Sequence, residues 1–561
     1  MELTGARILM KALKDEGTDT IFGYPGGQVI DIYDELVQTD IRHILVRHEQ
    51  GAVHAADGYA RAVGRVGVCL VTSGPGATNT VTGIASAYMD SIPLVVITGQ
   101  VPTHLIGIRS FQEVNIVGIT KPCTKRNYQI RRTEDIPGII KKAFHTARSG
   151  RPGPVLVDIP KNVATGKISC QPEKIARLKN FRPAPEPDVD RLETVVDRIK
   201  KAQRPVLFAG GGVILSGSSR DLAELARKTR IPVATSLMGL GAFPGTDPLC
   251  LGMLGMHGTY WANMSIGTCD LLIAVGARFD DRVAGNPETF APLAGIVHLD
   301  IDPASIPAKI PVAVSVAGDC KMILRHLNRR IDQTFMGDLT KKRRKWLDQI
   351  SRWKSTHPLT YKQTNIIKPQ FVVEKLYELT RGRAIITTEV GQNQMWAALH
   401  YLFDQPGHFI TSGGLGCMGF GLPAAIGAQV ARPDKLVIDI AGDGSIQMNI
   451  QEMATAVQSK LPIKVVILNN RYLGMVRQWQ ELFYGKRYAC TSMDDGLDFV
   501  KLAEAYGAVG LRATRPEEVE PVLLEGISTP KTVIMDFAVD PEESVYPMVP
   551  TGAPITEMLT A

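Results

Sequence analysis

The stretches KLVIDIAGDGSIQMNIQ (435–451) and KVVILNN (464–470) decide the fold of this chain. Each begins with a near-continuous apolar run, which is typical of a parallel strand buried on both faces. The first run ends in a Gly-Asp-Gly turn around Asp443, and the second ends in Asn469-Asn470. The 27 residues from Asp443 to Asn470 suit one strand–helix–strand unit. We therefore expect the two side chains at the same edge of a sheet.

Asp443 and Asn470 have the chemistry of a magnesium site. Carboxylate and amide oxygens suit Mg²⁺, a hard cation that prefers six-fold coordination. Gly442 and Gly444 let the backbone approach phosphate groups closely, and the helix start that follows the turn favours anions. A plain strand–turn–helix with an Asp cap is the alternative, but the spacing to the paired asparagines favours a metal–diphosphate site.

Similar apolar runs recur throughout the chain and alternate with helical patterns. They predict open, mostly parallel α/β sheets in three domains, with ligands beyond the carboxyl ends of the strands. A Pro-rich stretch (170–190; Pro172, Pro183, Pro185, Pro187) and a charged stretch (330–368) are interpreted as linkers. The expected domains are therefore 1–170, 190–330 and 368–561.

Composition narrows the class of protein. The 561 residues include 63 basic and 56 acidic residues, and the basic run 341–345 is interpreted as a solvated face or linker helix, so no nucleic-acid partner is expected. The eight cysteines form no CxxC pair, which indicates a reducing compartment, and we expect a cytoplasmic protein. No run of about 18 apolar residues predicts a membrane span. The N-terminus predicts an amphipathic helix capped by Thr4 rather than a signal peptide.

The first third of the chain carries a candidate acid. Glu49 lies in RHEQGA (47–52), between a strand-like run and a helical pattern. From the residues alone, Glu49 is interpreted as an acidic residue that stabilises a helix N-terminus. Two Gly-rich turns, YPGG (24–27) and SGPGATN (73–79), lie at neighbouring strand ends.

These motifs resemble those of the thiamine-diphosphate-dependent acetohydroxyacid synthases, and the resemblance covers nearly the whole chain. The matching stretches are YPGG, RHEQGA, SGPGATN, MDSIP (89–93), FQEV (111–114), SGRPGPVLVDIPK (149–161), LGMLGMHGT (251–259), GARFDDRV (276–283), GGLGCMGFGLPAAIGA (413–428), RQWQ (477–480) and YPMVPTGA (546–553).

The resemblance implies a pyrimidine-binding domain, a central FAD-binding domain and a diphosphate-binding domain. It implies decarboxylation of pyruvate and ligation of the hydroxyethyl carbanion to a second 2-oxo acid, either pyruvate or 2-oxobutanoate. The products would be 2-acetolactate and 2-aceto-2-hydroxybutanoate, which are precursors of valine, leucine and isoleucine. Another FAD-containing thiamine enzyme, a glyoxylate carboligase or a pyruvate oxidase, is the alternative. Glu49 argues against the carboligase, because that enzyme lacks the activating acid.

The resemblance also implies roles for single residues. The catalytic set would be Glu49, which activates the cofactor's aminopyrimidine, with Phe111, Gln112, Lys161, Arg282 and Trp479. The metal ligands would be Asp443, Asn470 and the backbone carbonyl of Tyr472. Thiamine diphosphate would contact Gly26, Val390, Gly391, Gln392, Asn393, Met418, Gly442, Gly444, Ser445 and Met475. FAD would contact Gly210, Gly211, Gly212, Leu237, Met238, Gly255, Met256, His257, Gly276, Arg278, Asp280, Asp300 and Ile301.

Six residues at four places depart from the family's usual pattern. Asn393 stands where a His is common, Glu389 replaces an Asp, and Trp261 replaces a small residue. Ile108-Arg109-Ser110 replaces Thr-Asp-Ala before Phe111 and could alter the acceptor. The resemblance further implies a homodimer or homotetramer, with the active site between two subunits, and a possible separate regulatory subunit.

Overall fold

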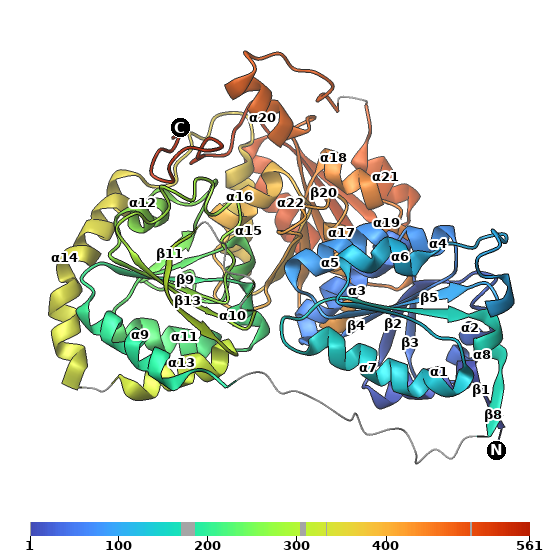
Figure 1. The fold of residues 1–561 in the computed structure, drawn as a ribbon. Helices are drawn as coiled ribbons and strands as arrows, with labels where there is room; N and C mark the ends of the chain where they lie inside the picture. The colour runs from blue at the N-terminus through green and yellow to red at the C-terminus, as the bar shows by residue number, and fades with distance from the viewer. Residues whose placement is uncertain are drawn as a thin grey trace.

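The computed structural model describes residues 2–169, 186–302, 304, 310–331, 334–493 and 496–560. Within these ranges, the chain forms three six-stranded sheets, and every strand pair in them is parallel (Figure 1). The prediction of three open parallel α/β sheets is confirmed. We call them the first, middle and last sheet, in chain order.

The first sheet has the spatial order β3 (Arg42–Leu45), β2 (Thr20–Tyr24), β4 (Gly67–Val71), β5 (Leu94–Gln100), β7 (Val155–Pro160), β6 (Arg126–Gln129). Its helices are α1 (Gly5–Asp15), α2 (Ile30–Val37), α3 (Glu49–Val63), α4 (Pro75–Thr78), α5 (Val81–Asp90), α6 (Ile116–Thr120), α7 (Ile136–Arg148) and α8 (Lys161–Thr165). Helices α1 and α7 cover one face, while α3 and α5 cover the face that turns towards the last sheet. The Thr4 hydroxyl accepts the Arg7 amide and caps α1, as predicted.

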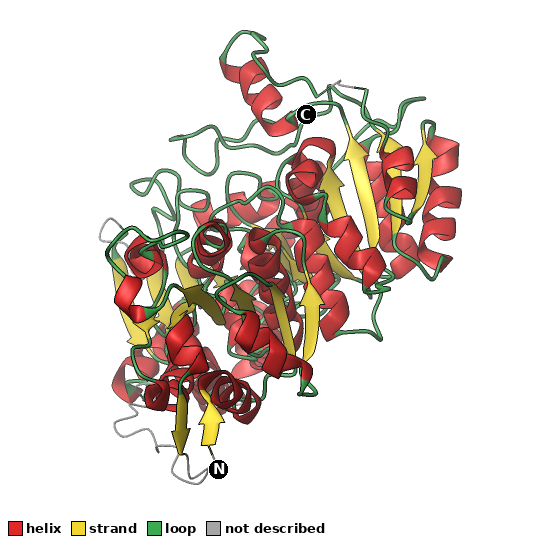
Figure 2. Ribbon diagram, turned by 90° about the vertical axis from the view of Figure 1, so that its right-hand side faces the viewer, coloured by secondary structure: helices red, strands yellow, loops and turns green. Residues whose placement is uncertain are grey.

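A short antiparallel pair closes this unit beside the N-terminus (Figure 2). It consists of β1 (Glu2–Thr4) and β8 (Lys167–Ser169). The predicted Pro-rich linker begins directly after β8, but most of it, including Pro172, Pro183 and Pro185, lies outside the described residues.

The middle sheet has the order β11 (Cys250–Met253), β10 (Val233–Thr235), β9 (Pro205–Ala209), β12 (Leu271–Val275), β13 (Gly295–Asp300), β14 (Val312–Ala317). Its helices are α9 (Val189–Lys201), α10 (Gly211–Leu215), α11 (Ser219–Thr229), α12 (Tyr260–Thr268), α13 (Cys320–Arg330) and α14 (Thr334–Thr356).

The last sheet has the order β16 (Phe409–Ile410), β15 (Ile385–Thr388), β17 (Val437–Gly442), β18 (Lys464–Asn469), β20 (Val533–Ala538), β19 (Val509–Ala513). Its helices are α15 (Pro369–Thr380), α16 (Gln392–His400), α17 (Gly421–Ala431), α18 (Asp443–Ile446), α19 (Glu452–Gln458), α20 (Gly474–Phe483), α21 (Phe499–Ala505) and α22 (Pro516–Ser528).

Helix α14 corrects the interpretation of 330–368 as a linker. Its Leu339, Trp346 and Ile350 are buried, and Arg343 on the same face is fully buried. The Arg343 guanidinium donates to the carbonyl oxygen of Ile199 (2.6 Å) and to that of Thr229. The apolar period was hidden in the sequence because a charged residue occupies one of its inward positions.

The first and last sheets meet through α3 and α17, which pack with almost no side chain between them. A Cβ on Gly58 would lie 2.2 Å from the Ala424 carbonyl oxygen, and one on Gly427 would lie 1.8 Å from that of Ala55. The pairing of 58 with 424 and of 55 with 427 makes the two helices antiparallel. One buried apolar cluster runs through this seam from sheet to sheet.

The chain ends against the middle sheet rather than the last one. Val549 donates its amide to the Met256 carbonyl oxygen (2.8 Å), and Ile555 joins the apolar cluster of the middle sheet. The C-terminus lies over this unit in Figure 1. In the part of the chain that is described, no helix is long and apolar enough to cross a membrane.

Candidate active site

The carboxyl ends of β17 and β18 bring the two predicted metal ligands together. The two strands are neighbours, and Asp443 and Asn470 follow their last residues. Both side chains line a cleft of about 100 Å³ together with Tyr472, and they are 2% and 5% exposed. The sequence expectation that these side chains share one edge agrees with this placement.

Hydrogen bonds fix Asn470 in the cleft. Its Oδ1 accepts the Tyr472 amide (3.1 Å), and its Nδ2 donates to Gln392 Oε1 (3.1 Å). Gln392 Nε2 donates in turn to Gln478 Oε1 (2.9 Å). A cation in the cleft would therefore meet side chains whose orientation is already set.

The donor set of this cleft fits Mg²⁺ bound together with phosphate. Burial raises the pKa of the Asp443 carboxyl to about 7, so a cation beside it would favour the ionised form. No group of three His, Cys, Asp or Glu residues converges anywhere in the described ranges. One carboxylate, one amide and one backbone carbonyl leave the remaining positions of a six-coordinate ion to ligand oxygens and water.

Asn393 lines the same cleft but uses its amide for the protein itself. Its Nδ2 donates to the carbonyl oxygens of Glu389 (3.0 Å) and Ile440 (2.8 Å). These bonds join the ends of β15 and β17. Only the Asn393 amide oxygen is left to face a ligand.

Glu389 is a buried acid that the sequence analysis noted only as a departure. Its carboxylate accepts the amide of Gly419 (2.7 Å), the amide of Leu422 (3.1 Å) and the hydroxyl of Ser445 (2.7 Å). Burial raises its pKa to about 7, and burial beside Glu389 raises the pKa of Asp439 further above its usual range. Through Glu389 and Gly419, Ser445 connects the Gly-Asp-Gly turn to the loop before α17. The local sequence signal for Glu389 is that it directly follows strand β15.

A second, much larger cavity of about 1790 Å³ lies where the three sheets meet. Most of the predicted flavin residues line it: Gly210, Gly211, Gly212, Leu237, Met238, Met256, His257, Gly276, Arg278, Asp280, Asp300 and Ile301. Arg282, Trp479, Val390, Gly391, Met418 and Met475 line it as well. The last four residues also line the Asp443 cleft, so the two spaces are continuous.

Two glycine turns shape the floor of the large cavity. A Cβ on Gly210 would lie 2.2 Å from the Gly276 carbonyl oxygen, and one on Gly212 would lie 2.7 Å from the Gly276 Cα. The turns after β9 and β12 therefore touch each other. Gly255 does not line the cavity; its missing side chain makes room for the Arg282 carbonyl oxygen, 2.4 Å from where a Cβ would be.

The predicted activating acid lies elsewhere. Glu49 is the first residue of α3, and its Oε2 accepts Asn79 Nδ2 (2.9 Å). A Cβ on Gly76 would lie 3.1 Å from Glu49 Oε1, and one on Gly74 would meet Gln112. Glu49, Gly26, Phe111, Gln112 and Lys161 are absent from the linings of both cavities.

The α3–α17 seam separates Glu49 from the Asp443 cleft within one chain. At the far end of α3, the Arg61 guanidinium lies 5.5 Å from the Phe420 ring, just before α17. The helix from Glu49 to Arg61 spans about 18 Å. The two predicted ends of the cofactor site thus lie at opposite ends of the packed helix pair.

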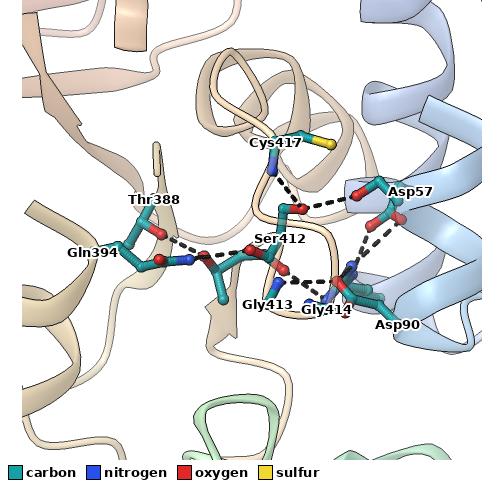
Figure 3. Close-up of polar contacts among 11 residues, drawn as sticks. Asp57, Asp90, Thr388, Gln394, Ser412, Gly413, Gly414 and Cys417 are labelled. Carbon is teal, nitrogen blue, oxygen red and sulfur yellow. Dashed lines mark hydrogen bonds and ion pairs between the residues drawn. The ribbon is translucent and has the colours of Figure 1, made fainter. Parts of the chain in front are cut away.

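A buried ion cluster that includes Asp57 and Asp90 lies against the loop of Gly413 and Gly414 (Figure 3). Arg61 pairs with Asp57 (2.6 Å) and Asp90 (3.0 Å), and Asp90 accepts the amides of Gly413 (3.2 Å) and Gly414 (2.7 Å). These two glycines begin the loop that carries Met418 into both cavities. The MDSIP motif thereby holds the GGLGCMG motif in place.

Comparison with known families defines the class of protein. Residues 3–119 match the description "Thiamine pyrophosphate enzyme, N-terminal TPP binding domain", residues 192–327 match the central domain and residues 389–537 match the C-terminal TPP binding domain of the same class. The fold and the site therefore belong to a thiamine pyrophosphate enzyme.

Full-length relatives narrow this class. The chain is 48% identical to the "Acetolactate synthase isozyme 3 large subunit" of Escherichia coli, covering 99% of this chain and 98% of the relative. It is 46% identical to the "Acetolactate synthase large subunit" of Haemophilus influenzae, over 100% and 98%. It is also 46% identical to a "Probable acetolactate synthase large subunit" of Methanocaldococcus jannaschii, over 99% and 95%. The chain belongs to the acetohydroxyacid (acetolactate) synthase catalytic subunits.

Proposed function

We propose that this enzyme decarboxylates pyruvate and joins the remaining two-carbon unit to a second 2-oxo acid. Pyruvate as acceptor gives 2-acetolactate, and 2-oxobutanoate gives 2-aceto-2-hydroxybutanoate, both for branched-chain amino acid synthesis. The observation that carries the proposal is identity of 48% over 99% of the chain to an acetolactate synthase, with Glu49, Asp443 and Asn470 all present.

The Asp443 cleft would hold the diphosphate end of thiamine diphosphate. The Asp443 carboxylate, Asn470 Oδ1 and the Tyr472 carbonyl oxygen would hold Mg²⁺, as the donor set described above supports. When bound, the thiazolium ring supplies the electron sink that accepts the electron pair left by CO₂. Glu49 would hold a proton at the pyrimidine ring nitrogen, which is the role of a general acid placed within hydrogen-bond reach.

The large cavity would hold FAD. It is lined at the carboxyl ends of the middle strands, where parallel sheets bind dinucleotides. Asp300 ends β13 in this lining, so its carboxylate would accept ribose hydroxyl groups. Arg282 lies in the same wall, and its guanidinium would bind the carboxylate of a 2-oxo acid. Trp479, packed edge-on against Phe483 (5.7 Å between ring centroids), would contact the acceptor's alkyl group.

The active site would be completed by a second copy of the chain. Within one chain, α3 holds Glu49 at the far end from the Asp443 cleft. Phe111, on the loop that packs beside Gly74, is 87% exposed, and Ile108 is 65% exposed. Large apolar side chains this exposed favour a subunit interface. A dimer is thus the smallest complete unit, with Glu49 of one copy facing the Asp443 cleft of the other.

A separate regulatory subunit is a further proposal. It rests on the printed names of the relatives, several of which are called large subunits. Co-expression with a candidate small subunit and measurement of its effect on acetolactate formation tests it.

One assay tests the activity. The purified protein receives thiamine diphosphate, Mg²⁺ and FAD, then pyruvate with and without 2-oxobutanoate, and the products are identified. Acetolactate alone from pyruvate, and both acetohydroxyacids from the mixture, are expected. Acetate or acetyl phosphate with flavin reduction, and no acetolactate, would assign a pyruvate oxidase instead.

A further inference from the structure

A second acid, Glu452, contacts the residues just before Glu49 but belongs to the unit of the last sheet. It is the first residue of α19 and is fully buried. It lines neither of the two cavities. Its partners are in the first sheet unit: Oε1 accepts the amides of Arg47 (3.0 Å) and His48 (3.0 Å), and Oε2 also accepts the Arg47 amide (3.2 Å).

The two amides that Glu452 binds directly precede Glu49. Strand β3 ends at Leu45 and α3 begins at Glu49, so Arg47 and His48 belong to neither element. His48 is the extended N-cap of α3, and its ring accepts the Gln50 amide (3.1 Å). Partly buried amides outside regular structure need an acceptor, and here a buried carboxylate from the last sheet unit supplies it.

Other residues of α19 bind the same segment. Thr455 donates its hydroxyl to Glu452 Oε2 (2.6 Å) and lies within hydrogen-bond distance of the Leu45 carbonyl oxygen (3.3 Å). Gln458 Oε1 accepts the Arg47 guanidinium (2.5 Å). One face of α19 carries residues 452, 455 and 458. This face binds the segment between β3 and α3.

Gly51 shows how closely the carboxylate approaches α3. A Cβ at this position would lie 2.6 Å from Glu452 Oε1 and 2.8 Å from its Cδ. The first turn of α3 can therefore rest against the carboxylate only because residue 51 has no side chain. The side chain of Glu49 is held separately, by Asn79.

We propose that Glu452 is a positioning residue for Glu49: by holding the amides of Arg47 and His48, it fixes where the first turn of α3 presents the Glu49 carboxyl. This inference rests on the proposed function, in which Glu49 activates the cofactor. Burial raises the pKa of Glu452 to about 7, and the hydrogen bonds from Thr455, Arg47 and His48 oppose this rise because they favour the ionised form. A shift of about 1 Å in a catalytic group can lower the rate about a hundredfold. Loss of the Glu452 hydrogen bonds is therefore expected to lower kcat.

The variants Glu452→Gln and Glu452→Ala test the proposal. Gln keeps the shape but places an NH₂ group against amide donors, and Ala removes both acceptors. We expect kcat to fall about tenfold for Gln and about a hundredfold for Ala, with KM for pyruvate and FAD affinity within about twofold of wild type. Hydrogen–deuterium exchange of the peptide 45–52 is expected to accelerate, while that of 464–470 stays unchanged.

A matched control is present in the middle sheet unit. Asp270 also accepts two successive amides, those of Gln203 (2.7 Å) and Arg204 (2.9 Å), and like Glu452 it lines neither cavity. Unlike Glu452, it does not contact the segment before α3. Asp270→Asn is expected to leave kcat, KM and exchange of 45–52 unchanged.

Two outcomes overturn the proposal. One is a Glu452→Ala protein that binds FAD normally and keeps kcat within about twofold of wild type. The other is a parallel loss of kcat, FAD affinity and thermal stability without faster exchange of 45–52, which assigns Glu452 a general structural role. If Glu452→Ala does not fold, the isosteric Gln variant decides. Activity of a Glu49→Gln protein refutes the role of Glu49, whereas the exchange measurement reports on Glu452 independently.

Discussion

Asp443 and Glu49 occupy two regions of the molecule that differ in how far one chain completes them. Asp443 and Asn470 are almost fully buried in a cleft whose side chains are oriented by Gln392 and Gln478. The loop beside Glu49 instead presents Phe111 to solvent. One chain therefore orients the side chains of the Asp443 cleft by itself, whereas the exposed Phe111 supports the proposal that a second copy completes the site around Glu49.

The largest expected effect comes from the acid end. Glu49→Gln removes the proton that the pyrimidine nitrogen must receive, so turnover is expected to fall by about a thousandfold or more. Cofactor binding and thermal stability are expected to stay near wild type, because Glu49 is not part of the Asp443 cleft. Acetolactate formation measures the loss, with the exposed Glu134→Gln as control. Near-normal activity would refute the assignment of the activating acid.

The variant Asp443→Asn, at the proposed metal site, is expected to weaken cofactor binding, whereas Glu49→Gln is expected to slow turnover. Asp443→Asn removes the only carboxylate among the three proposed ligands, so affinity for Mg²⁺ and thiamine diphosphate is expected to fall about a hundredfold. Excess cofactor should restore part of the activity, which it cannot do for Glu49→Gln. Titration of both cofactors by fluorescence quenching measures this contrast, and unchanged affinity would contradict the metal site.

Mixing the two inactive chains tests whether the two ends belong to different copies. In a random mixture, half of the dimers contain one chain of each kind, and each of these has one intact site. About a quarter of wild-type activity is therefore expected after co-refolding or co-expression. No recovery, with mixed dimers demonstrated by mass spectrometry, would place both ends in one chain.

The seam that separates the two ends is expected to be sensitive to a single methyl group. Gly427→Ala places a Cβ 1.8 Å from the Ala55 carbonyl oxygen and must push α3 away from α17. Overpacking of this kind costs about 1–3 kcal/mol, so the melting temperature should fall by several degrees, and kcat should fall with it. Gly138→Ala is the control, because Gly138 is partly exposed on α7 and an added Cβ would meet no atom outside its own helix within 4 Å.

The smallest effect is expected from the buried acids under the diphosphate cleft. The pKa of Glu389 in the folded protein, about 7, lies above its ordinary value of 4.5, so its stabilising contribution is present at low pH and is lost as pH rises through about 7. Asp439→Asn removes the neighbouring charge and should flatten this dependence. Melting temperatures of the cofactor-free protein from about pH 5 to about pH 8 measure the slope. An equal slope in both proteins would contradict the coupling.

Much of this architecture could be predicted from local pattern. Runs such as KVVILNN indicate buried parallel strands, and chain direction then places Asp443 and Asn470 at one edge. The packing of helix α14 on the middle sheet unit was missed because the buried Arg343 interrupts its apolar face. The roles of Glu452 and Asp90 gave no local signal, since the amides that Glu452 binds lie more than 400 residues away.

The sequence by itself determined the three parallel sheets, the Gly-Asp-Gly turn at a strand end and the family, because these depend on residues close together in the chain. Only the tertiary structure decided that Glu49 and Asp443 lie at opposite ends of the α3–α17 pair, that Asp90 holds the Gly413–Gly414 loop, and that Glu452 supports the start of α3. The physical reason is that these relations depend on how one sheet packs on another. Close glycine contacts and buried carboxylates set that packing, and their partners are distant in sequence.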